Sequence, residues 1–256
     1  MFSCDYHIHT QLSECAENDF SIEKIIEYQQ EHGLESIGIT DHDYSYQSKV
    51  KTIQSARQSI KDAEPSIDVH FGVESQMLDY QVTSIKIRMA SYFDYVLMAP
   101  NHYHLRGVER PKSIRDPRRV ALHEIYMFEA AIASPITDAV IHPFLLSPDV
   151  FQHSPETLAA FGQEMMNNIE HKRLIYQLDL ASQRGLGIEL TPKIIRYNQH
   201  HLIDFYQLCL ERDVKLLIGS DAHNIKQLEE LSLISPIIKD LGITEKNLWH
   251  PNNSNI

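Results

Sequence analysis

The sequence holds little cysteine, with three residues in 256, at positions 4, 15 and 209. An odd number of widely spaced thiols does not make a disulfide framework, so a reducing compartment is favoured. No run of 18 apolar residues occurs, and this predicts no transmembrane helix. Residues 1–5 lack the basic and apolar segments of a signal peptide. We therefore expect a soluble, cytoplasmic protein.

Positive charge is also scarce, because 23 Lys and Arg stand against 35 Asp and Glu, for a formal net charge of −12. Nucleic acid and anionic membranes would repel such a chain, which argues against non-specific binding to either. A small anionic substrate held by a local cation is still compatible. The sequence has no linker, low-complexity tract or internal repeat, so we expect a single domain over residues 1–256. The oligomeric state is left open.

Short runs rich in valine, isoleucine and leucine alternate with segments of helical apolar spacing. The seven predicted strands lie in residues 4–10, 34–43, 66–75, 93–102, 137–144, 185–192 and 214–223. The predicted helices occupy residues 21–32, 46–62, 83–91, 115–133, 156–183, 199–212 and 225–241. Buried strands that alternate with helices indicate a parallel sheet. Seven such units favour closure into a (β/α) barrel.

Histidines and carboxylates gather at the C-terminal ends of six of these predicted strands. The nine residues are His7, His9, Asp41, His42, Glu74, His102, His142, Asp221 and His223. In a parallel barrel the C-terminal strand ends meet at one mouth, where such folds carry out their chemistry. A single histidine at a strand end is usually a hydrogen-bonded structural residue. Nine residues of metal-binding types at one mouth indicate a metal centre.

The spacing of these residues agrees with metal binding. In the His-x-His pair at residues 7–9, strand alternation sends both imidazoles to the same face. The Asp-x-His pair at residues 221–223 repeats this geometry. Six histidines with Glu74 and Asp221 exceed the needs of one tetrahedral ion, so we expect two or three divalent ions, with carboxylates bridging them. The residues predict a multi-metal hydrolytic site.

The segments DYHIHT, GITDHD, GVES, NHYH, VIHPF and GSDAH resemble, in order, the successive motifs of the polymerase and histidinol phosphatase (PHP) superfamily. They cover residues 5 to 223. The resemblance implies a distorted, TIM-like (β/α)7 barrel with up to three metal ions that hydrolyses phosphate esters. It implies one ion held by His7, His9, Glu74 and Asp221, a second by His42 and His223, and a third by Glu74, His102 and His142.

The segment after the first strand departs from the family pattern. Where many phosphatases of the family have a histidine or an aspartate after "HT", this chain reads QLSECAE at residues 11–17. We expect Cys15 to be the extra ligand of the second ion, and Glu14 or Glu17 is the alternative. A thiolate suits zinc or iron and would shift the preference away from manganese.

Two further choices concern the fourth and sixth strands. His104 is an alternative to His102 as a ligand, and we prefer His102 because it lies closer to the apolar part of the strand. A phosphate also needs cationic donors besides the metals. Lys193 and Arg196 follow the sixth strand, where similar phosphatases place an arginine, and we expect Arg196 to contact the phosphate. The loop at residues 105–119, with six basic and two acidic residues, is a second candidate for substrate contacts.

The sequence thus predicts a metal-dependent phosphoesterase, specifically a histidinol-phosphatase-like phosphomonoesterase that uses a metal-activated hydroxide on a small phosphorylated substrate. One alternative is a phosphodiesterase or exonuclease on short nucleotides, for which the loop at 105–119 would be the distinguishing feature. Another is an amidohydrolase-type C–N hydrolase, although no lysine ends the fourth strand to bridge metals. Outside enzymes, the alternative is a metal-binding regulatory module. The sequence does not name the leaving group.

Overall fold

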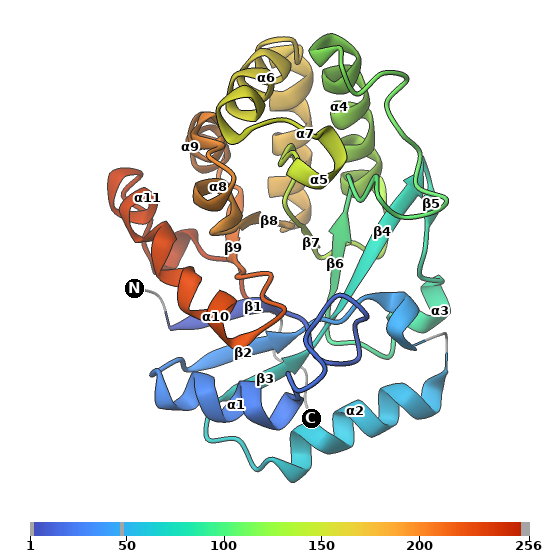
Figure 1. Ribbon diagram of the computed structural model, residues 1–256, viewed down its shortest axis with the longest axis vertical. Coiled ribbons are helices and arrows are strands. Elements are labelled where there is room, and N and C mark those ends of the chain that lie inside the picture. Colours follow the sequence, from blue (N-terminus) through green and yellow to red (C-terminus); the bar gives the residue numbers. More distant parts are fainter. Residues whose placement is uncertain (1–2, 47–48, 252–256) are drawn as a thin grey trace.

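The computed structural model describes residues 3–46 and 49–251. In these residues the strands form a three-stranded sheet, in the order β1-β2-β3, and a six-stranded sheet, in the order β5-β4-β6-β7-β8-β9 (Figure 1). The strands are β1 (Cys4–Ile8), β2 (Ser36–Ile39), β3 (Asp68–Phe71), β4 (Val73–Asp79), β5 (Val82–Thr83), β6 (Val96–Ala99), β7 (Ala139–Val140), β8 (Gly187–Leu190) and β9 (Lys215–Ile218). Their pairings are parallel, except that β4 and β5 are antiparallel.

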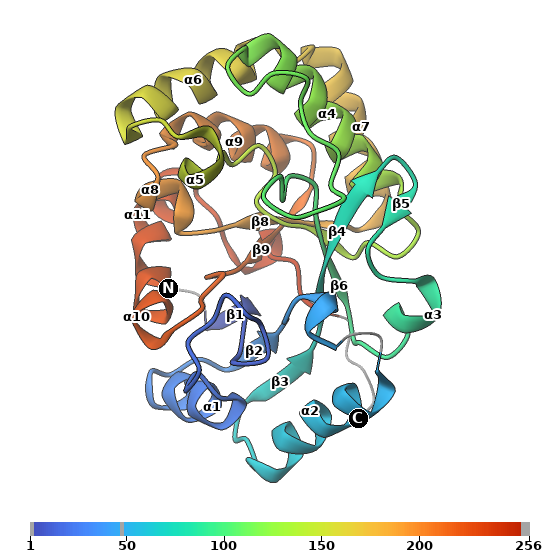
Figure 2. The ribbon, with the colours of Figure 1, turned by 45° about the vertical axis from the view of Figure 1, so that its right-hand side comes forward.

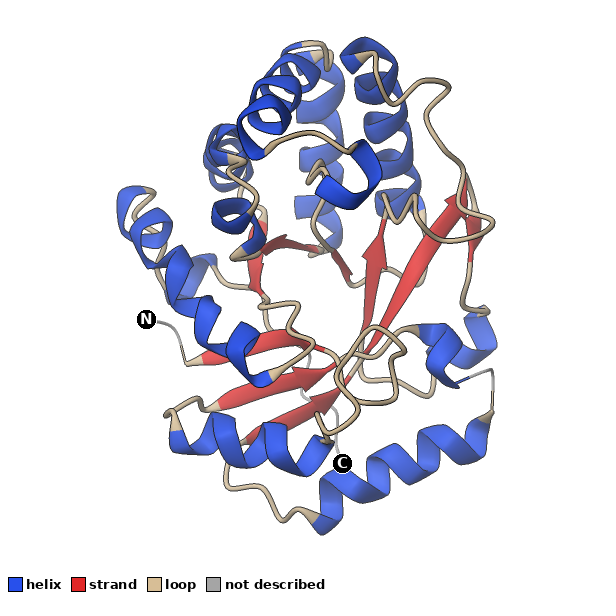
Figure 3. Cartoon of the chain, in the orientation of Figure 1, coloured by secondary structure: helices blue, strands red, loops and turns tan. Residues whose placement is uncertain are grey.

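The helices lie on the outer sides of these sheets (Figure 3). The α-helices are α1 (Ile22–Glu31), α2 (Val50–Asp62), α3 (Ile87–Ala90), α4 (Pro117–Ala133), α5 (Pro148–Phe151), α6 (Pro155–Asn167), α7 (His171–Arg184), α8 (Lys193–Arg196), α9 (Ile203–Glu211), α10 (Ile225–Glu229) and α11 (Ser235–Asp240). Short 3₁₀ helices cover Asp43–Tyr46, His200–Leu202, Glu230–Ile234 and Glu245–Asn247. None of the helices in the described part of the chain has the length and apolar character needed to cross a membrane.

Local sequence explains where the helices begin and which face they bury. Before α1, the Ser21 hydroxyl accepts the Lys24 N–H at 3.3 Å and caps the helix. Ile22, Ile25 and Ile26 then form a buried face at helical spacing. Figure 1 shows α1 and α2 beside the three-stranded sheet and α4, α7 and α9 beside the six-stranded sheet, while α6 packs against α4. This arrangement leaves the C-terminal strand ends free to carry polar residues.

The expected parallel α/β architecture is confirmed, whereas closure into a barrel stays a prediction. The third predicted strand is divided at Gly72 into β3 and β4, which belong to different sheets. A side chain at Gly72 would meet the Tyr95 ring, which lies 2.6 Å from the ideal Cβ position. Between the sheets, single parallel bridges join Ile8 to Ala222 and His42 to Glu74. The predicted single domain also stays a prediction.

Some predicted helices differ in extent from those observed. The segment 156–183 forms two helices, α6 and α7, because the chain turns at Asn168, whose side-chain amide donates to the Glu164 carbonyl at 2.8 Å. Most of the segment 83–91 is not helical, and only residues 87–90 form α3. The preceding residues 82–83 form β5, which pairs with β4. Apolar spacing alone did not separate these elements.

Candidate metal centre

The pair His7 and His9, at the end of β1, is fully buried at 0% exposure for each residue. Their Nε2 atoms lie 3.2 Å apart. Both face Glu74, whose Oε2 atom is 3.4 Å from His7 Nε2 and 3.1 Å from His9 Nε2. The strand alternation at Ile8 therefore brings two imidazoles and one carboxylate together at one point.

Glu74 lies at the centre of the cluster, because imidazoles that follow three other strands also reach its carboxylate. Its Oε2 is 3.1 Å from His42 Nδ1. Its Oε1 is 3.2 Å from His102 Nε2 and 3.6 Å from His142 Nε2. Burial by itself would raise the pKa of Glu74, but the imidazoles of His42 and His102 hold that pKa well below its ordinary value. Glu74 is thus an ionised carboxylate enclosed by nitrogen donors.

Asp221 lies on the β9 side of the same centre. Its Oδ1 is 3.2 Å from His9 Nε2 and 3.7 Å from both His7 Nε2 and His223 Nδ1, and its Oδ2 accepts from the ammonium of Lys193. Burial would raise the pKa of Asp221, but Lys193 and His7 hold it well below its ordinary value. Asp221 and His142 have positive φ angles of 51° and 35°. Such strained backbone is found preferentially at functional sites.

The exposed Cys15 belongs to a group with three of the predicted histidines. One potential ligand atom from each of His9, Cys15, His42 and His223 lies within 4.8 Å of the others. The His9 ring stacks on the His223 ring at a centroid distance of 4.2 Å and is 4.5 Å from the His42 ring. In the described part of the chain, Glu14 belongs to no such group, and neither does Glu17. The geometry favours Cys15 over the two alternatives.

A third group contains His42, Glu74 and His102, with ligand atoms again within 4.8 Å of one another. The His142 ring stacks on the His102 ring at 4.8 Å. His104 is exposed, and its ring centroid lies 5.2 Å from that of His102, outside the groups formed by the described residues. His102 is therefore better placed than His104.

These side chains fit divalent cations. Glu74 Oε1 and His142 Nε2 are buried and have no hydrogen-bond partner among the described residues. Buried polar atoms normally have a hydrogen-bond partner. These two atoms lie 3.6 Å apart, and each has a lone pair suited to bind a divalent cation. Burial lowers the pKa of His42 to about 4 and that of His223 to about 3, which keeps both rings neutral for ligation. Imidazole and carboxylate donors suit zinc, iron and manganese.

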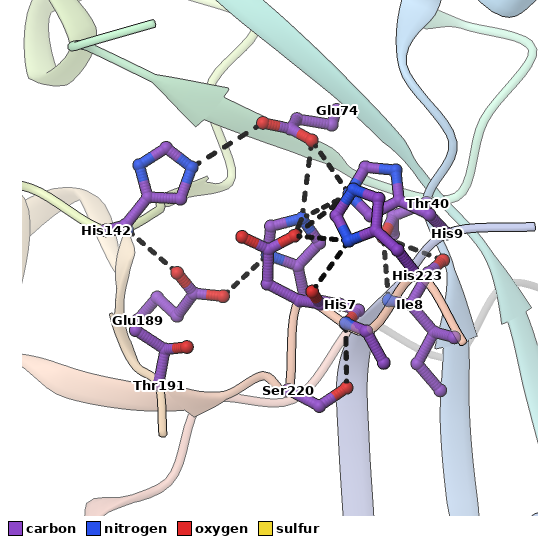
Figure 4. A network of polar contacts seen from close by, with 12 residues as sticks. His7, Ile8, His9, Thr40, Glu74, His142, Glu189, Thr191, Ser220 and His223 are labelled. Atoms are coloured by element: carbon purple, nitrogen blue, oxygen red, sulfur yellow. Dashed lines mark hydrogen bonds and ion pairs between the residues drawn. The ribbon is translucent and has the colours of Figure 1, made fainter. Parts of the chain in front are cut away.

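Glu189, in β8, is a residue of the site that sequence reasoning missed. Its Oε1 lies 2.6 Å from His7 Nδ1, and its Oε2 accepts the backbone N–H of His142 at 2.8 Å (Figure 4). A carboxylate at this position holds the proton on Nδ1 of His7 and turns the Nε2 lone pair toward the centre. The available signal was a lone carboxylate in the buried apolar run GLGIELTP.

Glu189→Ala is expected to lower metal affinity about 10–100-fold, because His7 would lose the partner that fixes its ring and tautomer. Glu189→Gln should recover part of this loss, since its side-chain oxygen can still accept. Metal titration followed by calorimetry measures the change. Equal affinity in the alanine variant and the parent would contradict a positioning role for Glu189.

Asn101 and Asp41 hold the ligand loops in place. The Asn101 amide donates to the carbonyls of His142 and Leu145, both at 3.1 Å, and its Oδ1 lies 3.0 Å from His142 Nδ1. The remaining lone pair of His142, on Nε2, therefore faces Glu74. Asp41 accepts the Thr10 N–H at 2.7 Å and the Ser13 hydroxyl at 2.6 Å. Neither of these bonds involves a histidine ring, so Asp41 supports the loop after β1.

Behind the centre, Glu124 on α4 is buried and accepts from the Tyr103 hydroxyl. Burial raises the pKa of Glu124 from 4.5 to about 7. Hydrogen bonds from Tyr103 and Asn101 lower this pKa, but by less than burial raises it. A raised carboxyl pKa means that the folded state favours the protonated form. Glu124 therefore costs no stability below pH 4.5, and its ionisation destabilises the fold as the pH rises toward about 7.

Glu124→Gln is expected to remove this pH dependence, so the variant should exceed the parent in free energy of unfolding by up to about 3 kcal/mol at pH 8. At pH 5 the two should differ little. Urea unfolding at both pH values measures this. Glu129→Gln is the control, because Glu129 lies on the same helix and pairs with Arg173. A parallel pH profile for Glu124→Gln and the parent would contradict the assignment.

The two cations that follow β8 have different partners. Lys193 is largely buried and reaches Asp221. The guanidinium of Arg196 is paired with Glu230, with Nε 2.7 Å from Glu230 Oε2. The predicted phosphate contact of Arg196 thus stays a prediction, and Lys193 is the cation that the fold brings to the cluster.

Parallel α/β sheets with histidines and carboxylates gathered at one edge define a metal-dependent hydrolase. The sequence matches the PHP domain family over residues 5–190, most of the chain, and the chain therefore belongs to this family. The membership confirms the prediction of a metal-dependent phosphoesterase. Divalent metal binding follows from the family and from the side-chain groups.

Solved structures share this fold. The histidinol phosphate phosphatase from Lactococcus lactis subsp. lactis Il1403, complexed with zinc, L-histidinol and phosphate, has a TM-score of 0.63 at 14% identity over 94% of each chain. A histidinol phosphatase, described as putative, from Listeria monocytogenes has a TM-score of 0.61 at 11% identity over 88% of this chain and 97% of that chain. At these identities the likeness shows the fold alone. No curated protein sequence matches the chain.

Proposed function

We propose that this protein is a phosphomonoesterase with two or three divalent ions at the C-terminal strand ends. One observation carries the proposal: the imidazoles of five histidines lie within 3.6 Å of the carboxylate of Glu74. A buried carboxylate with so many nitrogen donors is suited to bridge cations. The bridges Ile8–Ala222 and His42–Glu74 support treating the two sheets as parts of a distorted barrel with one mouth.

The proposed ligands divide into three sets. His7, His9, Glu74 and Asp221 hold the first ion, His42, His223 and Cys15 the second, and Glu74, His102 and His142 the third. The three groups of close ligand atoms support this division for His7, His9, Cys15, His42, Glu74, His102 and His223, with His9, His42 and Glu74 each in two groups. Asp221 and His142 are added because their side chains lie 3.2 Å from His9 and 3.6 Å from Glu74. The thiolate of Cys15 would favour zinc or iron over manganese.

The residues around these ligands prepare the site for a phosphate ester. When bound, the divalent ions lower the pKa of a coordinated water and neutralise charge on the phosphoryl oxygens. Glu189 and Asn101 keep the protons of His7 and His142 on Nδ1, so that the Nε2 lone pairs face the centre. Lys193 offers a cation beside Asp221, and Arg196 would contact phosphate after exchanging its Glu230 partner.

The substrate that we propose is a small phosphate monoester. The structural neighbour from Lactococcus lactis holds L-histidinol and phosphate with zinc, which supports a substrate of this size and charge. The net charge of −12 disfavours long nucleic acids. The leaving group itself is left to experiment, because several substrates share one fold and metal site.

Elemental analysis and a substrate panel test this function together. We expect more than one metal ion per chain and faster hydrolysis of monoesters, such as histidinol phosphate and p-nitrophenyl phosphate, than of bis-p-nitrophenyl phosphate or cyclic amides. Faster diester hydrolysis would assign a phosphodiesterase instead. Metal binding without hydrolysis of any substrate would indicate a regulatory module. Full activity with a single ion would contradict the multi-metal site.

Cys15→Ser is expected to weaken one metal site and to lower kcat, because a hydroxyl is a poor ligand compared with a thiolate. Cys4→Ser and Cys209→Ser are matched controls, since both thiols are buried away from the ligand groups. Metal content and rate on p-nitrophenyl phosphate provide the measurements. Unchanged values in Cys15→Ser would transfer the role to Glu14 or Glu17.

A further inference from the structure

A surface pocket of about 370 Å³ lies between the loop that precedes α4 and one face of α4 and α7. Figures 1 and 2 show these two helices side by side, with the loop passing from β6 to α4. The lining residues are Glu109, Arg110, Lys112, Arg119, Leu122, His123, Tyr126 and Arg173. None of them belongs to the metal centre. The volume falls within the range of small-molecule sites.

The floor of the pocket is an outward face of α4. Arg119, Leu122, His123 and Tyr126 follow the spacing i, i+3, i+4 and i+7, which places them on one side of the helix. Leu122 is 63% exposed, and its neighbours on this face, Arg119, His123 and Tyr126, are exposed or half-buried. Leu122, His123 and Tyr126 therefore give the floor apolar and aromatic side chains, of which Leu122 is the most exposed to solvent, and Arg119 adds a cation that pairs with Asp116.

The rim carries cations in a strongly acidic protein. Arg173 is neutralised by Glu129, with its Nε 2.6 Å from Glu129 Oε1, and Arg119 lies 3.4 Å from Asp116. Arg110 and Lys112 have no ion-pair partner within residues 3–46 and 49–251. The four cations of the lining outnumber its one carboxylate, Glu109, and the unpaired Arg110 and Lys112 beside Leu122 and Tyr126 complement an anion with an aromatic body.

The pocket is held against the rest of the fold by aromatic and backbone contacts. His123 Nε2 lies 3.1 Å from the Glu109 carbonyl, and Glu109 N–H donates to the Leu78 carbonyl at 2.7 Å. The Tyr126 hydroxyl donates to Asp79 at 3.0 Å. These contacts fix the shape of the loop and of the floor independently of the metal ligands.

We propose that this pocket binds a small aromatic anion at a second site, separate from the metal centre. The ring lies on Leu122 and Tyr126, and the acid group, whether phosphate, sulfonate or carboxylate, is held by Arg110 and Lys112. The site goes beyond phosphate ester hydrolysis, because none of these four side chains takes part in the proposed chemistry.

The test uses 8-anilino-1-naphthalenesulfonate, an aromatic sulfonate that a phosphatase cannot hydrolyse and whose fluorescence reports binding. We expect saturable binding of one probe per folded chain, with weaker affinity at higher salt. Charge reversal by Arg110→Glu with Lys112→Glu should weaken it at least tenfold. The pair Arg115→Glu with Arg118→Glu is the matched control, because it makes the same charge change in the same segment outside the lining.

Two further comparisons locate the probe. Leu122→Asn should weaken binding several-fold, whereas Leu233→Asn, at another exposed leucine, should not. Binding should persist in Glu74→Gln, and its loss there would place the probe in the metal centre and overturn the proposal. Equal weakening by both charge-reversal pairs, or the lack of saturable binding, would also overturn it. Thermal melting establishes that each variant is folded.

Discussion

Replacing Glu74 with glutamine is expected to reduce the bound metal to one ion or fewer and to lower kcat by about 10³-fold or more. The carboxylate faces five imidazoles and is the proposed bridge between ions. An amide is a neutral and weaker ligand, so the cations would lose both a shared donor and the charge that screens their repulsion. Elemental analysis and steady-state kinetics on a phosphate monoester measure the two effects.

Asp138→Asn is the control for this change. Asp138 accepts the Val96 N–H at 2.8 Å outside the metal centre, and an asparagine oxygen can accept the same bond. Its metal content and rate should match those of the parent. If Glu74→Gln retained the parent's metal content and lost only activity, Glu74 would act on the substrate and not as a bridging ligand.

Lys193→Ala is expected to lower kcat/KM about 10–1000-fold on every phosphate monoester, for roughly 1.5–4 kcal/mol of lost charge-assisted hydrogen bonding. Lys193 is the cation that reaches the cluster, through Asp221, and a bound phosphate would compete for it. Lys193→Arg should restore part of the rate because it keeps the charge. Metal content is the second readout and should change little.

Arg196→Ala separates the two cations. We expect a smaller fall, about tenfold in kcat/KM. A phosphate must first displace Glu230, and the loss of that ion pair offsets part of the binding free energy that Arg196 supplies. The variant Glu230→Gln should then lower KM by releasing the guanidinium. Unaltered kinetics in Arg196→Ala would refute the predicted phosphate contact, and unaltered kinetics in both alanine variants would leave the phosphate to the metals alone.

The sequence by itself determined the parallel α/β class and the candidate ligands. Buried strands that alternate with amphipathic helices show their period directly, and a parallel arrangement brings all C-terminal strand ends to one side. Histidines such as His7 and His9 were therefore identified as neighbours without knowledge of the fold. The predicted resemblance to the PHP family rested on the same segments, because their order along the chain is itself informative.

Only the tertiary structure decided which partners these residues have. Glu189 lies within a strand, not at its end, and its contact with His7 joins residues 182 positions apart. Lys193 and Arg196 have different partners, because Asp221 follows β9 and Glu230 begins a 3₁₀ helix further along the chain. The division of the third strand depends on the Tyr95 ring packed against Gly72. Such long-range contacts leave no period in the sequence, since hydrophobic patterning records which face is buried and not what is packed against it.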